Sequence, residues 1–252
     1  MRIAIIGGTG TLGRHVAAQL SARGHDVRAL SRSSPDFRVD LSSGEGLASA
    51  LDGCAAVVDA SNASSPKRAA QVLVEGSRRL LAAERQAGVR HHICVSIVGC
   101  ERIPMGYYRV KAEQERVVEH GAVPASIVRA TQFHELAAAA LSAAGKYRVL
   151  PIPRLQLQTV AAAEVASVVA DVAEGPSGHR RVQVAGPEIT SARELARTWT
   201  AVTGRTALML PLPVPGKLGR ALRGGALTAD RADVLGATTF ADWLLTQRRQ
   251  AG

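Results

Sequence analysis

Residues 2–16 read RIAIIGGTGTLGRHV, a short apolar run followed at once by glycines and then by an amphipathic segment. Gly7, Gly10 and Gly13 recur at three-residue steps. Gly7 permits a tight turn, Gly10 lets the backbone approach an anion, and Gly13 lets a helix pack close to a sheet. A helix beginning near Thr11 directs free N–H groups at that anion. The stretch predicts a dinucleotide-binding loop, the alternative being a glycine-rich turn packed for structure alone.

The N-terminal half continues this alternation of strands and helices. The predicted strands are Arg2–Ile6, Val27–Leu30, Phe37–Asp40, Ala55–Asp59, His92–Ser96 and Ala125–Arg129. Helical segments between strands predict an α/β fold, a Rossmann-type doubly wound parallel sheet. The alternation of strand and helix signals becomes irregular after Thr131. We therefore expect a single domain, residues 1–252. Residues 1–135 form the dinucleotide-binding core, and residues 136–252 are mostly a small irregular C-terminal substrate lobe that partly returns to the sheet.

Composition excludes several classes of protein. The chain has 252 residues, of which 46% are hydrophobic and 21% charged, which excludes intrinsic disorder. We expect no membrane span, because the longest apolar stretches fall short of the ~20 residues that one requires. The first residues do not fit a signal peptide, so we expect a cytoplasmic protein. Three cysteines without CxxC spacing predict neither a disulfide framework nor a metal site.

The net charge of +10 is unevenly distributed. Residues 1–174 hold 20 basic and 16 acidic side chains, whereas residues 175–252 hold 11 and 5, a surplus of 6 in under a third of the length. Aromatic residues make up only 3% of the chain, so few side chains are available for stacking on bases. We interpret the charge as a solvated basic surface with one or two arginines that bind phosphates. We expect neither nucleic acid nor a membrane as partner.

The end of the second strand favours NADP(H) over NAD. Arg32 stands where an acidic residue would bind the ribose hydroxyls of NAD. A guanidinium binds a 2′-phosphate in bidentate fashion, Ser31 adds a hydroxyl, and Arg14 is a second candidate. The alternative is that both arginines are merely exposed. Asp40 and Leu41, after the third predicted strand, are candidates for the adenine edge.

Tyr107 and Lys111 form the pattern Tyr-x-x-x-Lys on a predicted helix and share one face of it. A free phenol has a pKa near ~10, and a nearby ammonium lowers it, so Lys111 is expected to activate Tyr107. Tyr107 would then protonate a substrate oxygen as hydride arrives. Ser96, at the end of the fifth predicted strand, is the candidate hydrogen-bond donor to the same oxygen. The alternatives are that Tyr108 does this chemistry, or that neither tyrosine does.

Together these motifs resemble the atypical, NmrA-like branch of the short-chain dehydrogenase/reductases over roughly residues 1–175. The resemblance rests on the glycine loop, Ser31-Arg32, Asp40-Leu41, residues 95–99, Tyr107-x-x-x-Lys111 and residues 128–133. It implies a cofactor site that consists of Gly7, Thr9, Gly10, Thr11, Leu12, Gly13, Arg14, Ser31, Arg32, Ala60, Ser61, Asn62 and Lys111. It also implies a catalytic Ser96, Tyr107 and Lys111, and a substrate pocket bordered by Gln132, Phe133 and His134.

These features lead to one main functional hypothesis and two alternatives. The main one is an NADPH-dependent oxidoreductase that transfers hydride to a carbonyl or quinone-like, rather hydrophobic small molecule. The protein would act as a monomer or homodimer. One alternative is a catalytically silent NADP(H)-sensing regulatory protein, although Tyr107, which many NmrA-like proteins lack, favours an active reductase. The other is a non-redox epimerase or lyase that retains the dinucleotide.

Overall fold

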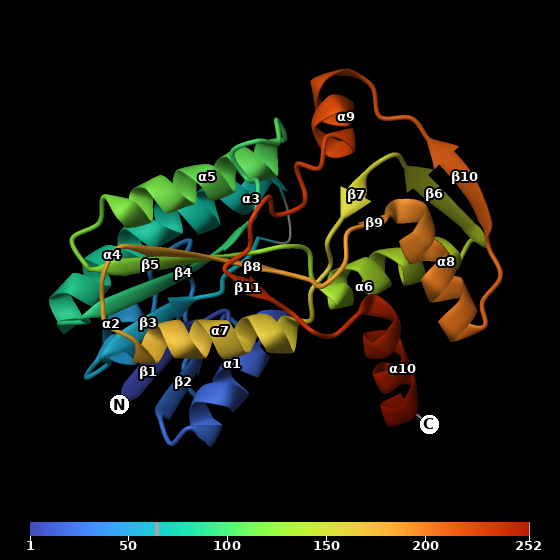
Figure 1. Ribbon diagram of the computed structural model, residues 1–252. Coiled ribbons are helices and arrows are strands. Elements are labelled where there is room, and N and C mark those ends of the chain that lie inside the picture. Colours follow the sequence, from blue (N-terminus) through green and yellow to red (C-terminus); the bar gives the residue numbers. More distant parts are fainter. Residues whose placement is uncertain (64–65, 252) are drawn as a thin grey trace.

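A seven-stranded parallel sheet forms the centre of the computed structural model, which describes residues 1–63 and 66–251 (Figure 1). The strand order is β11-β8-β5-β4-β3-β1-β2. The strands are β1 (Arg2–Ile6), β2 (Asp26–Leu30), β3 (Ala56–Asp59), β4 (His91–Ile97), β5 (Ala125–Ala130), β8 (Arg180–Ala185) and β11 (Val234–Leu235). β3 is buried along its whole length and β5 nearly so, because helices cover both faces of the sheet, which confirms the predicted α/β class.

The topology brings two loops together at the carboxyl end of the sheet. After β1 the chain adds β2 on one side of it and β3 on the other, so that Ile3 lies opposite both Val27 and Ala56. The glycine loop after β1 and residues 60–62 after β3 therefore lie side by side. Ligands of doubly wound sheets bind at such a reversal of strand order.

Two groups of helices enclose the sheet (Figure 1). One face is covered by α1 (Thr11–Ala22) and α7 (Ala162–Glu174), whose buried alanine, valine and leucine side chains pack on the strands. The other face is covered by α2 (Leu47–Leu51), the π-helix η1 (Ala70–Glu75), α4 (Gly76–Ala87) and α5 (Gly106–Glu119). The short α3 (Pro66–Ala69) leads directly into η1.

The C-terminal lobe has its own small core. Trp199 is fully buried in it together with Leu150, Ile152 and Phe240. Two strand pairs belong to the lobe: β6 with β10, which are parallel, and β7 with β9, which are antiparallel. Its elements are α6 (His134–Gly145), β6 (Val149–Pro153), β7 (Gln156–Leu157), β9 (Thr190–Ser191), α8 (Ala192–Thr203), β10 (Leu208–Leu212), α9 (Gly216–Arg223) and α10 (Phe240–Ala251). No helix of the described ranges is long and apolar enough to cross a membrane.

The predicted strand Phe37–Asp40 is not a strand of the sheet. Only isolated bridges form there, between Ser31 and Arg38 and between Asp40 and Glu45. The Ser34 hydroxyl donates to the Ala29 carbonyl and accepts from the Phe37 N–H, so this segment folds back on the end of β2. An apolar run of this length reads as a strand in sequence, but here local side-chain bonds produce a turn.

Candidate active site

The glycine loop leaves almost no room for side chains. Gly7 has a φ of +73°, and a Cβ there would lie 2.7 Å from the carbonyl oxygen of Ala60. A Cβ on Gly13 would lie 2.2 Å from the carbonyl oxygen of Gly7, so the first turn of α1 packs directly on the loop. Gly10 precedes α1 and makes no side-chain cap. The first N–H groups of α1 are therefore not capped by a side chain, which leaves them available to an anion.

Side chains around the loop differ in exposure. Thr9 and Thr11 are exposed, whereas Leu12 is buried against the sheet. Arg14 on α1 and Arg32 after β2 are both exposed, and neither guanidinium makes a hydrogen bond or ion pair within the described residues. Two guanidinium groups beside the loop are thus available for a phosphate.

Asp40 and Leu41, the candidates for the adenine edge, have local roles in the structure. One carboxylate oxygen of Asp40 accepts hydrogen bonds from the N–H and the hydroxyl of Ser42, at 2.8 and 2.7 Å. These bonds lower the pKa of Asp40 below its ordinary value. Leu41 is buried in the core under α4. Near Arg32, the Ser31 hydroxyl accepts the N–H of Ser33 at 3.1 Å.

The loop after β3 touches both the glycine loop and α5. The N–H of Ala60 donates to the carbonyl of Ile6 at 3.0 Å, which fixes the loop beside the end of β1. The Ser61 hydroxyl is buried and has no hydrogen-bond partner among the described residues. The Asn62 side-chain oxygen accepts the hydroxyl of Tyr107 at 2.7 Å. A predicted ribose-binding loop and the predicted catalytic tyrosine are therefore in direct contact.

Tyr107 and Lys111 lie on α5, which begins at Gly106 just after Pro104. Lys111 is only 3% exposed. Its Nζ donates to the Val95 carbonyl at 2.8 Å and to the Gln114 side-chain oxygen at 2.6 Å. The helix therefore places both side chains near the carboxyl end of β4, with Lys111 held from two sides.

The environment of Tyr107 acts against ionisation. Burial raises the pKa of Tyr107 to about 12, and the neighbouring Tyr108 adds to this. The direction is opposite to the one expected from the sequence, where Lys111 lowers this pKa. The Lys111 amine is bonded to Val95 and Gln114, so the phenol of the protein alone stays protonated at neutral pH.

Ser96 provides a buried hydroxyl at this site. It lies on β4 directly after Val95, whose carbonyl binds Lys111. Its side chain is buried, and its Oγ has no hydrogen-bond partner among the described residues. A buried polar atom without a partner is costly unless a ligand or water satisfies it. Together with the unpartnered Ser61 hydroxyl and the glycine cradle, it fits a site built for a dinucleotide and a second small molecule.

A buried polar network that the sequence reasoning missed connects these parts. Gln114 donates from its amide nitrogen to Asp59 at 3.0 Å and to the Ser77 hydroxyl at 3.1 Å, while its oxygen binds Lys111. The other Asp59 oxygen accepts the N–H of Ser61 at 3.0 Å. One carboxylate therefore holds both the loop next to Tyr107 and the glutamine that holds Lys111. The sequence did contain a signal for this network, since Asp59 and Ser77 are polar residues at positions where the strand and the buried face of the helix are otherwise mostly apolar.

The three predicted substrate residues have different environments. The Gln132 amide donates to the Leu227 carbonyl at 3.1 Å, and its buried oxygen has no partner within the described residues. Phe133 is partly buried against the sheet core. His134 is fully buried, and its Nε2 lies 3.0 Å from the Thr238 carbonyl, next to aromatic rings of α10. His134 therefore packs in the lobe core, whereas Gln132 retains a free acceptor.

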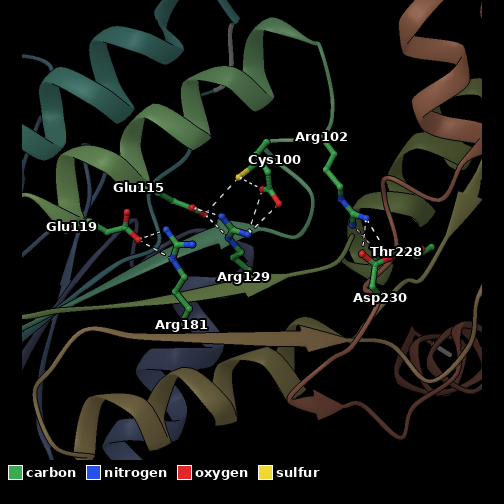
Figure 2. Close-up of polar contacts among 9 residues, drawn as sticks. Cys100, Arg102, Glu115, Glu119, Arg129, Arg181, Thr228 and Asp230 are labelled. Atoms are coloured by element: carbon green, nitrogen blue, oxygen red, sulfur yellow. Dashed lines mark hydrogen bonds and ion pairs between the residues drawn. The ribbon is translucent and has the colours of Figure 1, made fainter.

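Charged side chains fix α5 to its surroundings (Figure 2). Arg129 on β5 binds both oxygens of Glu115, one turn after Lys111, at 2.9 and 2.6 Å. Arg102 binds the Asp230 carboxylate and the Thr228 carbonyl, which joins the loop before α5 to the C-terminal segment. Within the described ranges, no three His, Cys, Asp or Glu side chains gather closely enough to hold a metal ion.

Comparison with solved structures shows the same fold throughout the chain. The NADPH-dependent quinone oxidoreductase of Escherichia coli, solved with NADPH, aligns with a TM-score of 0.75 at 20% identity, covering 98% of this chain and 99% of that one. The UDP-glucose 4-epimerase of Thermus thermophilus, solved with NAD, aligns with a TM-score of 0.74 at 20% identity and covers both chains fully, at 100% each. At these identities the likeness establishes the fold.

Curated relatives fall into two kinds. A (4-alkanoyl-5-oxo-2,5-dihydrofuran-3-yl)methyl phosphate reductase of Streptomyces griseus is 30% identical over 246 residues, 84% of this chain and 82% of that one. A photosystem II assembly factor of Trieres chinensis is 31% identical over 154 residues, 54% of this chain. The chain spans 47% of the length of that assembly factor.

A family model supplies the classification. It is described as NAD(P)H-binding, and it matches residues 7–176, from the glycine loop to the end of α7. The match includes the glycine loop, the loop after β3 and α5, which together form the site described above. With this match and the reductase relative, the chain belongs to the NAD(P)H-binding family, as its motifs predicted.

Proposed function

We propose that the protein is an NADPH-dependent oxidoreductase that reduces a carbonyl or quinone-like small molecule. One observation carries the proposal: the buried Lys111 of α5 donates to the carbonyl of Val95, the neighbour of Ser96 with its unpartnered hydroxyl, and Tyr107 lies one turn earlier on the same helix. The glycine loop and residues 60–62 lie at the same carboxyl edge of the sheet. A nicotinamide dinucleotide, when bound, supplies the hydride. The side chains of this chain then have to bind the substrate oxygen and provide its proton.

The proton chemistry follows from the contacts of Tyr107. Its hydroxyl already donates to Asn62, and burial keeps the phenol protonated at neutral pH. Tyr107 therefore acts as a general acid: its hydroxyl releases Asn62 and transfers its proton to the substrate oxygen. Ser96 donates a second hydrogen bond to that oxygen, and Lys111 would bind the nicotinamide ribose. General acid catalysis of this kind contributes roughly 10²- to 10⁴-fold.

Replacing Tyr107 tests the catalytic role. We expect Tyr107→Phe to lower turnover by roughly 10²- to 10⁴-fold and to leave NADPH affinity nearly unchanged, measured by steady-state kinetics and fluorescence titration. Tyr108→Phe, one residue along the same helix, is the matched control and should retain turnover. Full activity of the Tyr107 variant would remove the assigned role.

Preference for NADP(H) is proposed from the two free guanidinium groups. Arg32 with Ser31 after β2, and Arg14 on α1, would bind the 2′-phosphate. We expect Arg32→Ala to weaken NADPH binding by roughly 10- to 100-fold, the effect of losing hydrogen bonds between charged groups, and to leave NADH binding unchanged. Arg90→Ala, at the opposite end of the sheet, is the control. Equal losses for both cofactors would contradict the proposal.

The substrate is proposed to be a small and rather hydrophobic carbonyl compound. The reductase of Streptomyces griseus acts, by its name, on an alkanoyl dihydrofuranone methyl phosphate, and the Escherichia coli neighbour is a quinone oxidoreductase. A panel for the turnover assay therefore includes acylated furanones, with and without phosphate, alongside quinones and simple ketones. A cytoplasmic location and a monomeric or homodimeric state remain predictions from the sequence.

A second candidate is a NADP(H)-binding protein that senses the cofactor and acts on a partner protein. The photosystem II assembly factors among the relatives favour it, since their names describe assembly and not catalysis. It predicts cofactor binding without turnover of any compound in the panel. An epimerase or lyase, as in the solved neighbour of Thermus thermophilus, would instead convert its substrate without net consumption of NADPH.

A further inference from the structure

One face of the β6–β10 pair is apolar and exposed. Leu208, Leu210 and Leu212 alternate along β10 and are 62%, 44% and 44% exposed. Val149 and Pro151 of β6 lie opposite Leu208 and Leu210 and are exposed as well. We call the surface formed by these five residues the lobe face. On the opposite side of the same two strands, Leu150 and Ile152 are buried in the lobe core, and the partly buried Met209 packs against it.

The lobe face lies within two acid-free stretches of sequence. Residues 136–163 contain three Lys or Arg and no Asp or Glu, and residues 195–229 contain five and none. These eight cations nearly equal the net charge of the whole chain, +10. Both strands thus lie in stretches that carry only positive charge, and the five cations of residues 195–229 make up most of the surplus of 6 in residues 175–252.

The cations bracket the lobe face at both ends. Because β6 and β10 are parallel, Lys146 and Arg205 precede the strands at one end, Arg205 with its guanidinium over the Trp199 ring, whereas Arg154 follows β6 and Lys217 follows β10 on α9 at the other. All four side chains are exposed. Tyr147, beside Lys146, is 82% exposed, the largest exposed fraction among the large apolar side chains of the described residues. In Figure 1 the two strands form the rim of the lobe, away from β1 and β2.

We propose that the lobe face is a docking surface for an anionic lipid membrane. Aliphatic side chains of the face enter the boundary between headgroups and acyl chains, and the bracketing cations bind lipid phosphates. The exposed Tyr147 is a residue type that is enriched at such interfaces. Contact of this kind needs no spanning helix. It therefore changes the expectation from the sequence that a membrane is not a partner, and it stands independently of the proposed catalysis.

Other occupants fit the lobe face less well. Two copies of the chain would bring together faces of the same charge with no carboxylate to pair them. Nucleic acid would use the cations but leave the leucines in water. A protein partner is usually bound through aromatic, methionine and arginine side chains, and leucine is under-represented among the residues that dominate such affinities. Aliphatic residues framed by cations match the chemistry of an anionic bilayer best.

Vesicle sedimentation tests the proposal on the full chain. The wild-type protein is mixed with vesicles of phosphatidylcholine alone, or of equal parts phosphatidylcholine and phosphatidylglycerol, at about 0.1 M salt. We expect binding to the anionic vesicles only. The double variant Leu208→Ser with Leu210→Ser should bind roughly ten-fold more weakly or worse, and the double variant Lys146→Gln with Lys217→Gln should lose roughly five-fold for each cation.

Two controls carry the same chemical changes elsewhere. Leu235→Ser, on the edge strand β11, removes a leucine that is 63% exposed, and Arg90→Gln removes an exposed cation before β4. Both should bind vesicles like the wild-type protein, and thermal unfolding should show that all variants fold. The proposal is overturned if the wild-type protein does not bind anionic vesicles, or if the leucine variant binds them equally well.

Two further outcomes would assign the lobe face to another occupant and so overturn the proposal. One is a dimer, seen by light scattering, that the leucine variant dissociates. The other is tighter binding to polyglutamate or duplex DNA than to anionic vesicles, weakened by the same leucine variant.

Discussion

Gln114 is the side chain whose replacement tests the buried network most directly. It accepts a hydrogen bond from Lys111 and donates to Asp59 and Ser77, and all four side chains are buried. Leucine has a similar volume, so Gln114→Leu removes these three bonds without leaving a large cavity. Lys111 then keeps the Val95 carbonyl as its remaining acceptor.

The expected magnitude follows from the partners. Hydrogen bonds to charged groups are worth about 1.5–3 kcal/mol each, and Gln114 makes one to Lys111 and one to Asp59. Asp59 retains the N–H of Ser61, which offsets part of the loss. We expect the free energy of unfolding to fall by about 3–5 kcal/mol, the sum of the two lost hydrogen bonds to charged groups less this offset. A domain has only about 5–15 kcal/mol of stability in total.

Urea denaturation followed by circular dichroism measures this loss. The midpoint should fall while the dependence on urea concentration stays constant, since the surface exposed on unfolding does not change. Gln86→Leu, on the exposed side of α4, is the matched control and should change stability by less than about 0.5 kcal/mol. A loss below about 1 kcal/mol for Gln114→Leu would refute the reasoning that the network depends on this amide.

Three further outcomes are expected. Arg129→Met should cost about 3–5 kcal/mol in urea denaturation because it leaves the buried Glu115 without its cationic partner, whereas Arg181→Met, which breaks the exposed pair with Glu119, should cost less than about 1 kcal/mol. Gly13→Ala should weaken NADPH binding by more than roughly ten-fold in fluorescence titration, since its Cβ would overlap the Gly7 carbonyl; Gly106→Ala, with open space around it, should bind normally. Burial lowers the pKa of His134, so the neutral form stabilises the fold above a pH of about 6.5 and this contribution is lost as the pH falls below that value. His134→Phe should show a weaker decline of melting temperature over that range, and an unchanged decline would contradict the assignment.

Local patterns predicted the parts of the site that depend on backbone geometry. The roles of Gly7 and Gly13 could be assigned from their spacing because only glycine fits where a helix packs on a tight loop. The structure agrees, since a Cβ at either position would overlap backbone atoms. Tyr107 and Lys111 could be placed on one helix face for a similar reason, since a separation of four residues fixes their relation. The parallel sheet followed from the alternation of strands and helices.

Features that depend on partners far apart in the chain could not be predicted. Gln114 contacts Asp59 across 55 residues of sequence, and no periodicity relates the two. The pKa of Tyr107 was expected in the wrong direction because helix spacing gives proximity to Lys111 but not the competing acceptors of its amine, Val95 and Gln114. His134 was expected at the pocket, yet the aromatic residues of α10, over 100 residues later, enclose it.

The π-helical turn η1, just before α4, determines which way the following side chains point. A π-turn holds one residue more than a regular helical turn, and here η1 ends at Glu75, two residues before Ser77, whose hydroxyl donates to the Leu73 carbonyl and lies 3.4 Å from Asp59. One residue corresponds to a rotation of about 100° around a helix axis. A single-residue deletion within Ala70–Glu75 would therefore restore an ordinary helix and turn Ser77 away from the network. One inserted residue thus sets the direction in which the side chains of α4 point. An insertion or deletion there would disturb the buried network more than most single substitutions.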